Sequence, residues 1–411
     1  MKLLVVSGSP LDQVGGRYYA YDTWLRLVQH LSREIGGVTL WSPVRALGDT
    51  RIPERAWLVE PGGLAIEPHE HFNSFKSYYR GWPFLQRRLR DRFARLLSGH
   101  DLVVLRTPSP MSGLVMREAR RQRKPVVMMV LGNLATQAGG LISHTGLMRL
   151  AFKGAVTAAI LQELWCGRQA HELIVYSREI AVRHRRVGSF PKLMQDPALR
   201  LADIVPRSDT CLHDEIRIVR VCWIIPSKGL ESLIDAVASL RAEGQKVVLD
   251  IVGHERTEGY LEVLRHRAAG LGIADVVHFR GWVPADAIEN VYLQADIQVI
   301  SSLAEGTPRC IAEGLARGVP LVCTAVGGCV DILEDGANAL LVPPGDSRAI
   351  AAAVRRLTQD VNLRRRLIKA GYTIAHQATF EILGARFVSI LHRVVETQGR
   401  LVPECFDLTS V

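Results

Sequence analysis

Two glutamates, Glu305 and Glu313, stand eight residues apart in the stretch EGTPRCIAEGLARGVP (305–320). The preceding apolar run ADIQVISS (295–302) predicts a buried strand, so Glu305 belongs to the loop at the carboxyl end of that strand. Open α/β sheets bind their ligands at this end. The pair is therefore placed where chemistry is expected.

A helix is predicted directly after Glu305. Thr307 and Pro308 have the residue types of an N-cap and a first helical position, and Gly318 is a stop signal after a helix over 309–317. The free amides at such a helix start can bind a phosphate. Carboxylates would repel phosphate and suit hydroxyls, so sugar and ribose hydroxyls flanking a diphosphate would satisfy both acids. The alternative is a simple loop acid followed by a solvated helix residue.

Strand-like runs alternate with helical periodicities along the chain, which is typical of parallel sheets covered on both faces. This alternation of strands and helices starts twice along the chain, so we predict two doubly wound Rossmann-like α/β domains that face each other across a ligand-binding cleft. Their ranges are 1–205 and 206–385, with the loop-rich segment 188–214 as linker and 386–411 as a helix and tail that return toward the first domain. The predicted strands cover 2–8, 101–106, 124–130, 171–177, 216–224, 246–253, 275–281, 295–302 and 319–325, and predicted helices include 19–35, 83–97, 111–122 and those within 363–397.

Charge is unevenly distributed between the two halves. Residues 1–200 carry 29 Lys and Arg against 15 Asp and Glu, whereas 201–411 carry 22 against 26, so the halves are +14 and −4. A basic first half favours an anionic acceptor or an anionic membrane surface; without a reading motif, nucleic acid is not expected. The seven cysteines show no metal or disulfide spacing, and we identify no signal peptide and no membrane span, so the expected location is the cytoplasm, with the inner face of the plasma membrane as a peripheral option.

The segment SSLAEGTPRCIAEGLARGVPLVCTAVGGCVDILEDGANALLVPPGD (301–346) resembles the signature of family 4 retaining glycosyltransferases, the E-x7-E group 1 enzymes with the GT-B fold. Upstream, IIPSKGLESLIDAVASL (224–240), IVGHER (251–256) and VVHFRGWVP (276–284) are similar to further elements of this family. The likeness is thinner in GSPLDQVGGRYYAYDTWLRLVQHL (8–31). The resemblance implies a GT-B fold and a nucleotide-sugar donor.

Roles for single residues follow from the resemblance. Glu305 would hold hydroxyls of the transferred sugar and Glu313 those of the ribose, while Lys228 would stabilise the charge that builds on the leaving diphosphate. Backbone around the site would complete it, with Val283 beside the base and the diphosphate cradled by Gly16, Gly306, Thr307 and Pro308. We expect no metal and no resident cofactor, because no Asp-x-Asp follows a strand.

Two departures from the family pattern bear on catalysis. Trp223 stands where an arginine is usual, with Arg220 three residues earlier, and Leu131 replaces a histidine at the end of an N-terminal strand. No acid or base can be named in the first half; Arg106 is a candidate phosphate or acceptor contact or a member of an ordinary ion pair.

Three functions are consistent with this sequence. The first is a retaining hexosyltransferase that uses a nucleotide sugar and a saccharide or polyprenyl-linked acceptor, in polysaccharide or glycoconjugate biosynthesis. The second is a catalytically silent GT-B protein that binds a nucleotide sugar or a partner, which Leu131 and Trp223 favour. The third is an enzyme that acts on a nucleotide sugar without an acceptor.

Overall fold

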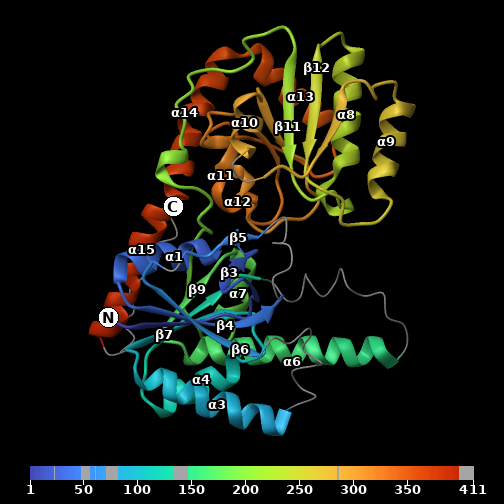
Figure 1. The fold of residues 1–411 in the computed structure, drawn as a ribbon. Coiled ribbons are helices and arrows are strands. Elements are labelled where there is room, and N and C mark those ends of the chain that lie inside the picture. The colour runs from blue at the N-terminus through green and yellow to red at the C-terminus, as the bar shows by residue number, and fades with distance from the viewer. Residues whose placement is uncertain are drawn as a thin grey trace. The chain divides into compact units, whose positions relative to one another are not determined.

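The computed structural model describes residues 1–22, 24–47, 56–60, 62–70, 82–132, 147–284 and 287–397 (Figure 1). The chain divides into two compact units, one formed by residues 1–194 together with the described residues from Gly384 on, and the other by residues 195–383. The last helix, α15 (Phe380–Glu396), begins in the second unit and ends in the first. Among the described residues, no helix is long and apolar enough to cross a membrane.

The N-terminal unit is built on one mixed sheet with the order β10-β9-β8-β7-β1-β4-β2-β3-β5, to which β6 is added beside β4. The four strands predicted in this half correspond to β1, β7, β8 and β9, whereas β4, β6 and β10, which also pair in parallel, were not predicted. The strands are β1 (Leu3–Val6), β2 (Leu11–Val14), β3 (Arg17–Ala20), β4 (Val38–Ala46), β5 (Trp57–Leu58), β6 (Leu64–Glu70), β7 (Leu102–Thr107), β8 (Val126–Val130), β9 (Glu172–Val175) and β10 (Pro191–Leu193).

The expectation of purely parallel sheets is wrong for this unit, because β2 and β3 form an antiparallel hairpin. Gly15 and Gly16 make its two-residue turn with φ of 54° and 76°. Positive φ at both positions is the condition for the type I′ turn that matches strand twist. The hairpin also corrects the predicted helix over 19–35, since its first residues belong to β3 and the helix α1 begins at Trp24 (Trp24–Ile35).

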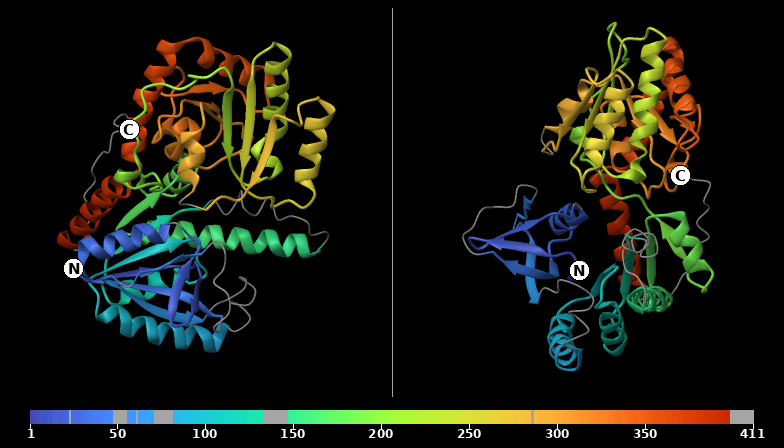
Figure 2. Two further views of the ribbon diagram at one scale, coloured as in Figure 1. Left: turned by 45° about the horizontal axis from the view of Figure 1, so that its top comes forward. Right: turned by 90° about the vertical axis from the view of Figure 1, so that its right-hand side faces the viewer.

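Helices cover both faces of this sheet (Figure 1, Figure 2). The helices α3 and α4 lie on one face with α6 beside α4, and α1 lies on the other. Apolar side chains of α3 and α4 pack on β1, β7 and β8 in a single buried cluster that includes Phe93, Val115 and Met128. The bounds are α3 (Trp82–Ser98), α4 (Ser112–Arg121), α6 (Leu147–Gln169) and α7 (Arg178–Arg185).

The C-terminal unit contains a six-stranded sheet with the order β13-β12-β11-β14-β15-β16, in which every pairing is parallel. All five strands predicted for this half are confirmed. The strands are β11 (Ile216–Val221), β12 (Val247–Val252), β13 (Val277–Gly281), β14 (Ile297–Ile300), β15 (Leu321–Thr324) and β16 (Leu340–Val342). The helices are α8 (Leu230–Ala242), α9 (Tyr260–Gly270), α10 (Ile288–Leu293), α11 (Cys310–Leu315), α12 (Cys329–Ile332), α13 (Ser347–Gln359) and α14 (Val361–Gln377).

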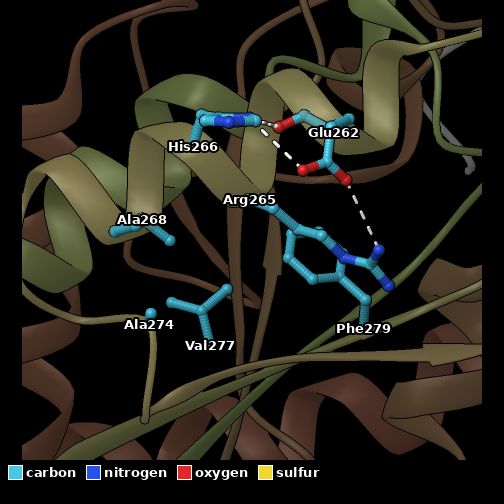
Figure 3. A pocket seen from close by; sticks show the side chains of 8 residues that line it. Glu262, Arg265, His266, Ala268, Ala274, Val277 and Phe279 are labelled. Carbon is cyan, nitrogen blue, oxygen red and sulfur yellow. Dashed lines mark hydrogen bonds and ion pairs between the residues drawn. The ribbon is translucent and has the colours of Figure 1, made fainter.

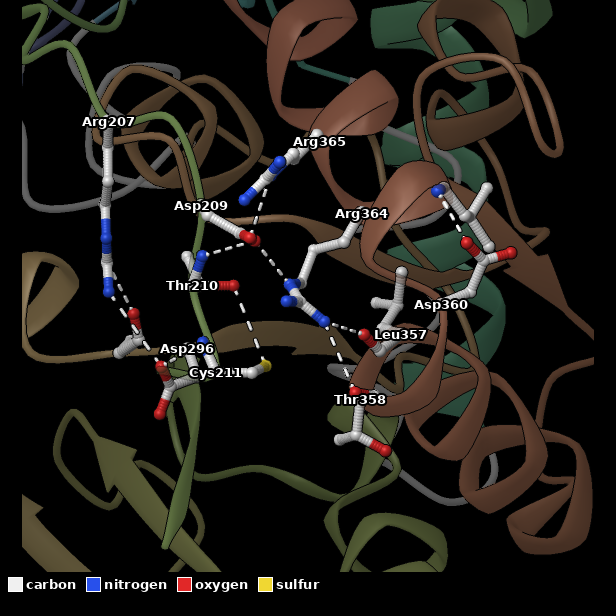
Figure 4. Close-up of polar contacts among 12 residues, drawn as sticks. Arg207, Asp209, Thr210, Cys211, Asp296, Leu357, Thr358, Asp360, Arg364 and Arg365 are labelled. Atoms are coloured by element: carbon white, nitrogen blue, oxygen red, sulfur yellow. Dashed lines mark hydrogen bonds and ion pairs between the residues drawn. The ribbon is translucent and has the colours of Figure 1, made fainter. Parts of the chain in front are cut away.

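The segment that leads into β11 is fixed by a buried ion pair (Figure 4). Asp209 accepts a hydrogen bond of 2.6 Å from Arg364 Nε in α14, and both side chains are buried. Arg365 adds a second contact of 3.0 Å. Burial alone would raise the pKa of Asp209, but the hydrogen bonds from Arg364, the Thr210 amide and Arg365 lower it below its ordinary value. This pair ties the start of the sheet to the helices that cover it.

Candidate active site

Lys228 and Glu305 meet at the carboxyl edge of the C-terminal sheet. Lys228 ends the short helical turn Pro226–Lys228 that follows β11, and Glu305 lies in the loop that follows β14. These strands are parallel neighbours, so their carboxyl ends open on the same edge. Lys228 Nζ lies 2.6 Å from Glu305 Oε1, and the side chains are only 14 % and 10 % exposed. The sequence prediction that both residues belong to one place is consistent with this geometry.

Arg220 is buried next to this pair and contacts Glu305, a role that we did not predict. Its Nη2 donates a 2.6 Å hydrogen bond to Ser302 Oγ, which in turn donates to Glu305 Oε1 at 2.6 Å. The same nitrogen lies 3.5 Å from Glu305 Oε1, with the arginine side chain 1 % exposed. Burial alone would lower the pKa of Arg220, but Cys222, Cys310 and Glu305 nearby raise it. The guanidinium therefore remains charged in the interior.

The three donors leave one oxygen of Glu305 for a ligand. Lys228, Ser302 and Arg220 all converge on Oε1. Among the described residues, none donates a hydrogen bond to Oε2. Because an ionised carboxylate accepts at both oxygens, Oε2 can accept from hydroxyls of a bound molecule.

The loop that carries Glu305 rests on a glycine turn after β15. Gly328 N donates to Gly306 O at 2.9 Å. Gly327 has φ of 49°, and a Cβ added there would lie 1.9 Å from Glu305 O; one added at Gly328 would lie 2.4 Å from Thr307 Oγ1. Any larger residue at these positions would displace the loop, so the turn sets the position of Glu305.

Glu313 lies in α11 with a different partner. Tyr292 OH donates to Glu313 Oε2 at 3.3 Å. Burial raises the pKa of Tyr292 well above its ordinary value, and Glu313 adds to this shift. Tyr292 therefore stays protonated and orients the carboxylate as a hydrogen-bond donor. Its role, like that of Arg220, was not predicted.

The helix that carries Glu313 differs from the predicted one. It covers Cys310–Leu315, shorter than the expected 309–317, and its N-cap is Arg309 in a helical conformation. The expected cap by Thr307 with Pro308 at the first helical position is therefore wrong. Gly318, with φ of 63°, ends the helical segment as predicted.

The remaining predicted site residues lie in other elements. Val283 follows β13 and packs against the buried cluster that contains Tyr292, which places it on the Glu313 side of the site. The neighbouring Trp282 is 41 % exposed, so it is not a simple core residue. Gly16 belongs to the hairpin turn of the N-terminal unit. Its contact with a diphosphate stays a prediction.

Trp223 forms an aromatic and cationic cluster with residues that follow β12. Its ring centroid lies 4.3 Å from that of His254 in an edge-on arrangement, and the Arg256 guanidinium lies 4.8 Å above the indole. Arg256 thus stands at the sheet edge where Trp223 departs from the family pattern. Gly253 precedes His254 with φ of 140°, and a Cβ added there would lie 1.8 Å from Cys222 O, so only glycine fits between the two segments.

Arg106, at the end of β7, forms an ion pair, which is one of the two roles that the sequence suggested for it. Its Nη2 donates to Asp22 Oδ2 at 2.5 Å, and its guanidinium lies 5.0 Å from the centre of the Trp24 ring. Ser9 joins the same carboxylate at 2.8 Å. Leu131 directly follows β8, as expected, and the next described residue is Gly132, so neither of these two positions supplies an acid or a base.

A hollow of about 490 Å³ lies at the flank of the C-terminal sheet, away from this edge (Figure 3). It is formed between α9 and the edge strand β13 by Glu262, Arg265, His266, Ala268, Ala269, Ala274, Val277 and Phe279. Glu262 pairs with Arg265 at 3.5 Å. Glu262 also lies 3.4 Å from His266 Nδ1, so the charged side chains of this hollow are exposed and paired with one another. Within the described residues, no three His, Cys, Asp or Glu side chains gather into a metal site.

Comparison with known proteins identifies similar sequences for the second half of the chain. Residues 211–374 match the family model of glycosyl transferases group 1. An uncharacterized glycosyltransferase of Methanocaldococcus jannaschii is 29 % identical over 195 residues, which are 47 % of this chain and 49 % of that protein. The amylovoran biosynthesis glycosyltransferase AmsK of Erwinia amylovora is 30 % identical over 154 residues, or 36 % and 37 % of the two chains. The chain thus spans less than half the length of these curated relatives.

The whole chain resembles solved structures. HepE of Anabaena, solved in complex with UDP, aligns with a TM-score of 0.67 at 17 % identity, covering 96 % of this chain and 100 % of that one. This likeness establishes the fold, which is GT-B. The fold predicted from the sequence is confirmed.

Proposed function

We propose that this chain, whose residues 211–374 match the family model of glycosyl transferases group 1, is a retaining glycosyltransferase. It would move a hexose from a nucleotide-sugar donor to a saccharide or lipid-linked acceptor, in polysaccharide or glycoconjugate biosynthesis. The observation that carries the proposal is the convergence of Lys228 and Arg220 on Glu305 at a ligand-binding sheet edge.

The charge of this cluster favours a diphosphate. Arg220 and Lys228 contribute two positive charges and Glu305 one negative charge, so the cluster carries +1. Arg220 is fixed in the interior, whereas Lys228 ends on a flexible stem and can turn from Glu305 to a phosphate oxygen. A cation in that position stabilises the leaving diphosphate more strongly as its charge grows, which lowers the barrier.

The two acids would then hold hydroxyls on either side of the diphosphate. Glu305 offers Oε2 to the transferred sugar, and Glu313 is oriented by Tyr292 toward the ribose. Backbone amides of Gly306 and Thr307 would contact the phosphates, with Pro308 shaping the loop. Val283 would border the base, and Gly16 would approach the diphosphate from the hairpin turn.

We further propose that the reaction retains configuration and needs no metal. The acceptor hydroxyl would attack the anomeric carbon on the face that the diphosphate leaves, and its proton would pass to the departing phosphate oxygen. The bond from the anomeric carbon to that oxygen breaks as the new glycosidic bond forms. Activity unchanged by EDTA and an α-linked product from an α-linked donor, detected by proton NMR, are the expected results. An inverted product or loss of activity with EDTA would contradict this part of the proposal.

The second candidate is a GT-B protein that binds a nucleotide sugar without turnover. Trp223 favours it, because an indole follows β11 at the position where the resemblance leads us to expect an arginine for the anionic group. The two functions differ in product. Transfer of radiolabelled sugar to a lipid or saccharide extract supports the enzyme, and donor binding with no labelled product supports the silent protein.

A further inference from the structure

The helix α6 (Leu147–Gln169) exposes an apolar line of residues, which we call the outer stripe: Gly154, Ala158, Leu161 and Trp165. Their spacing of four, three and four residues places them on one side of the helix. Leu161 is 61 % exposed and Trp165 is 37 % exposed. The opposite side of the same helix is buried through Glu163, Cys166 and Gly167.

The outer stripe reverses the normal pattern of a surface helix. An amphipathic helix places its apolar side in the core and polar residues outside, whereas α6 presents two large apolar side chains to water. Figure 1 shows α6 extending along the N-terminal unit as its longest helix. An exposed apolar line of this kind indicates a surface that something else covers.

The charge around the outer stripe is positive. Lys153 and Arg168 are exposed beside it. The only acid between residues 152 and 169 is Glu163, which is 3 % exposed and pairs with Arg183 of α7 at 2.8 Å. His184 Nε2 also lies 3.5 Å from this carboxylate. The exposed charges of α6 are therefore positive, and its single negative charge is buried and paired with Arg183.

The neighbouring helix adds to this charge. Because Glu163 and Arg183 are in contact, α7 packs against the buried side of α6. It carries the exposed Arg178 and Arg185 with one exposed acid, Glu179, and is followed by the exposed Arg186. Residues 1–200 as a whole carry +14. A partner that matches both the exposed apolar residues and the positive charge must have an apolar interior beneath a negatively charged surface.

We propose that the outer stripe of α6 lies in the interface of an anionic membrane, with Leu161 and Trp165 among the lipid chains and Lys153 and Arg168 at the headgroups. Tryptophan and basic residues are the side chains that occupy this boundary. α6 would lie parallel to the membrane surface, since it does not qualify as a membrane span. This inference goes beyond glycosyl transfer and does not depend on it, although it would bring the N-terminal unit to a lipid-linked acceptor.

Vesicle flotation of the full chain at low salt, without donor, tests the proposal. We expect the wild type to float with vesicles of phosphatidylcholine and phosphatidylglycerol and to remain unbound with phosphatidylcholine alone. The double variant L161D/W165D should lose at least about tenfold in apparent affinity, because two charged groups replace the inserted side chains. K153E/R168E should lose binding in the same assay while keeping the apolar residues.

The control is V263D, which places the same charge at an exposed apolar position of α9 in the other unit, where Val263 is 56 % exposed. It should float as the wild type does. Circular dichroism melting checks that each variant is folded. Equal flotation of wild type and L161D/W165D would overturn the proposal, as would a wild type that binds no anionic vesicle. If light scattering shows a dimer that L161D/W165D dissociates, and vesicles are not bound, the outer stripe is a contact between copies and the membrane proposal is wrong.

Discussion

Changing Glu305 to glutamine should destabilise the C-terminal unit, because it leaves a buried cation without its anion. Arg220 is 1 % exposed and lies 3.5 Å from Glu305 Oε1. At that distance, with an effective dielectric constant of about 20, the attraction is roughly 5 kcal/mol. Lys228 is less affected, since its flexible side chain can turn toward water.

The expected loss of unfolding free energy is smaller than this attraction. Glutamine retains the oxygen that accepts from Ser302, and Ser302 still accepts from Arg220 at 2.6 Å. Removing one partner of a buried pair usually costs about 3 to 5 kcal/mol, and the retained hydrogen bonds place E305Q near the lower end. For a unit of this size, about 3 kcal/mol corresponds to a fall in Tm of roughly 6–12 °C.

Thermal melting followed by circular dichroism, with E305Q, R220M and the double variant, measures this cost. We expect the double variant to be more stable than E305Q, because methionine removes the cation that E305Q leaves unpaired. The matched control K228M/E305Q should recover much less. A melting temperature of E305Q within about 1 °C of the wild type, or strictly additive losses in E305Q/R220M, would refute the reasoning.

Three further predictions concern other contacts of the C-terminal unit. G327A should lower Tm and weaken donor binding, because its Cβ would lie 1.9 Å from Glu305 O, whereas G336A, at φ of 71° with open space around it, should cost only the backbone strain in the same melting assay. Y292F should weaken nucleotide binding by a few fold in calorimetry while changing stability by about 1 kcal/mol, since it removes only the hydrogen bond to Glu313. Because the folded-state pKa of Asp209 is lowered, its ionised carboxylate stabilises the fold above the unfolded pKa of about 4, and this stabilisation is lost as the pH falls below that value. D209N lacks this titrating group, so its free energy of unfolding, measured by acid unfolding, should depend less on pH in this range than that of the wild type.

The sequence predicted the C-terminal unit well because its strands are buried on both faces. The run 319–325 is almost entirely apolar, and in 246–253 only Asp250 interrupts the apolar residues of the strand, so β15 and β12 were found there. The N-terminal unit was harder, because β4 contains Arg45 and Pro43 and the hairpin β2–β3 is short. These features interrupt the periodicity on which the prediction depends.

Part of the candidate site could be proposed from the sequence for a similar reason. Lys228, Glu305 and Glu313 occur in local motifs that the sequence displays directly. Arg220 acts through a strand neighbour, since it lies in β11 and contacts residues that follow β14, and such pairing is invisible without the sheet order. The available signal was the presence of charged residues, Arg217 and Arg220, in the apolar strand IRIVRV (216–221), because a charge in the interior requires a partner.

The central claim is that Lys228, Glu305 and Glu313 form a nucleotide-sugar site. Thermal shift with a panel of nucleoside diphosphates and nucleotide sugars, on the wild type and on E313A, tests it most directly. A ligand at one hundred times its Kd stabilises the protein by about 2.7 kcal/mol, which is readily detected. We predict that the diphosphates of one base raise Tm in the wild type and that E313A loses most of this shift. No shift with any of these ligands at millimolar concentration, or an equal shift in E313A, would contradict the account.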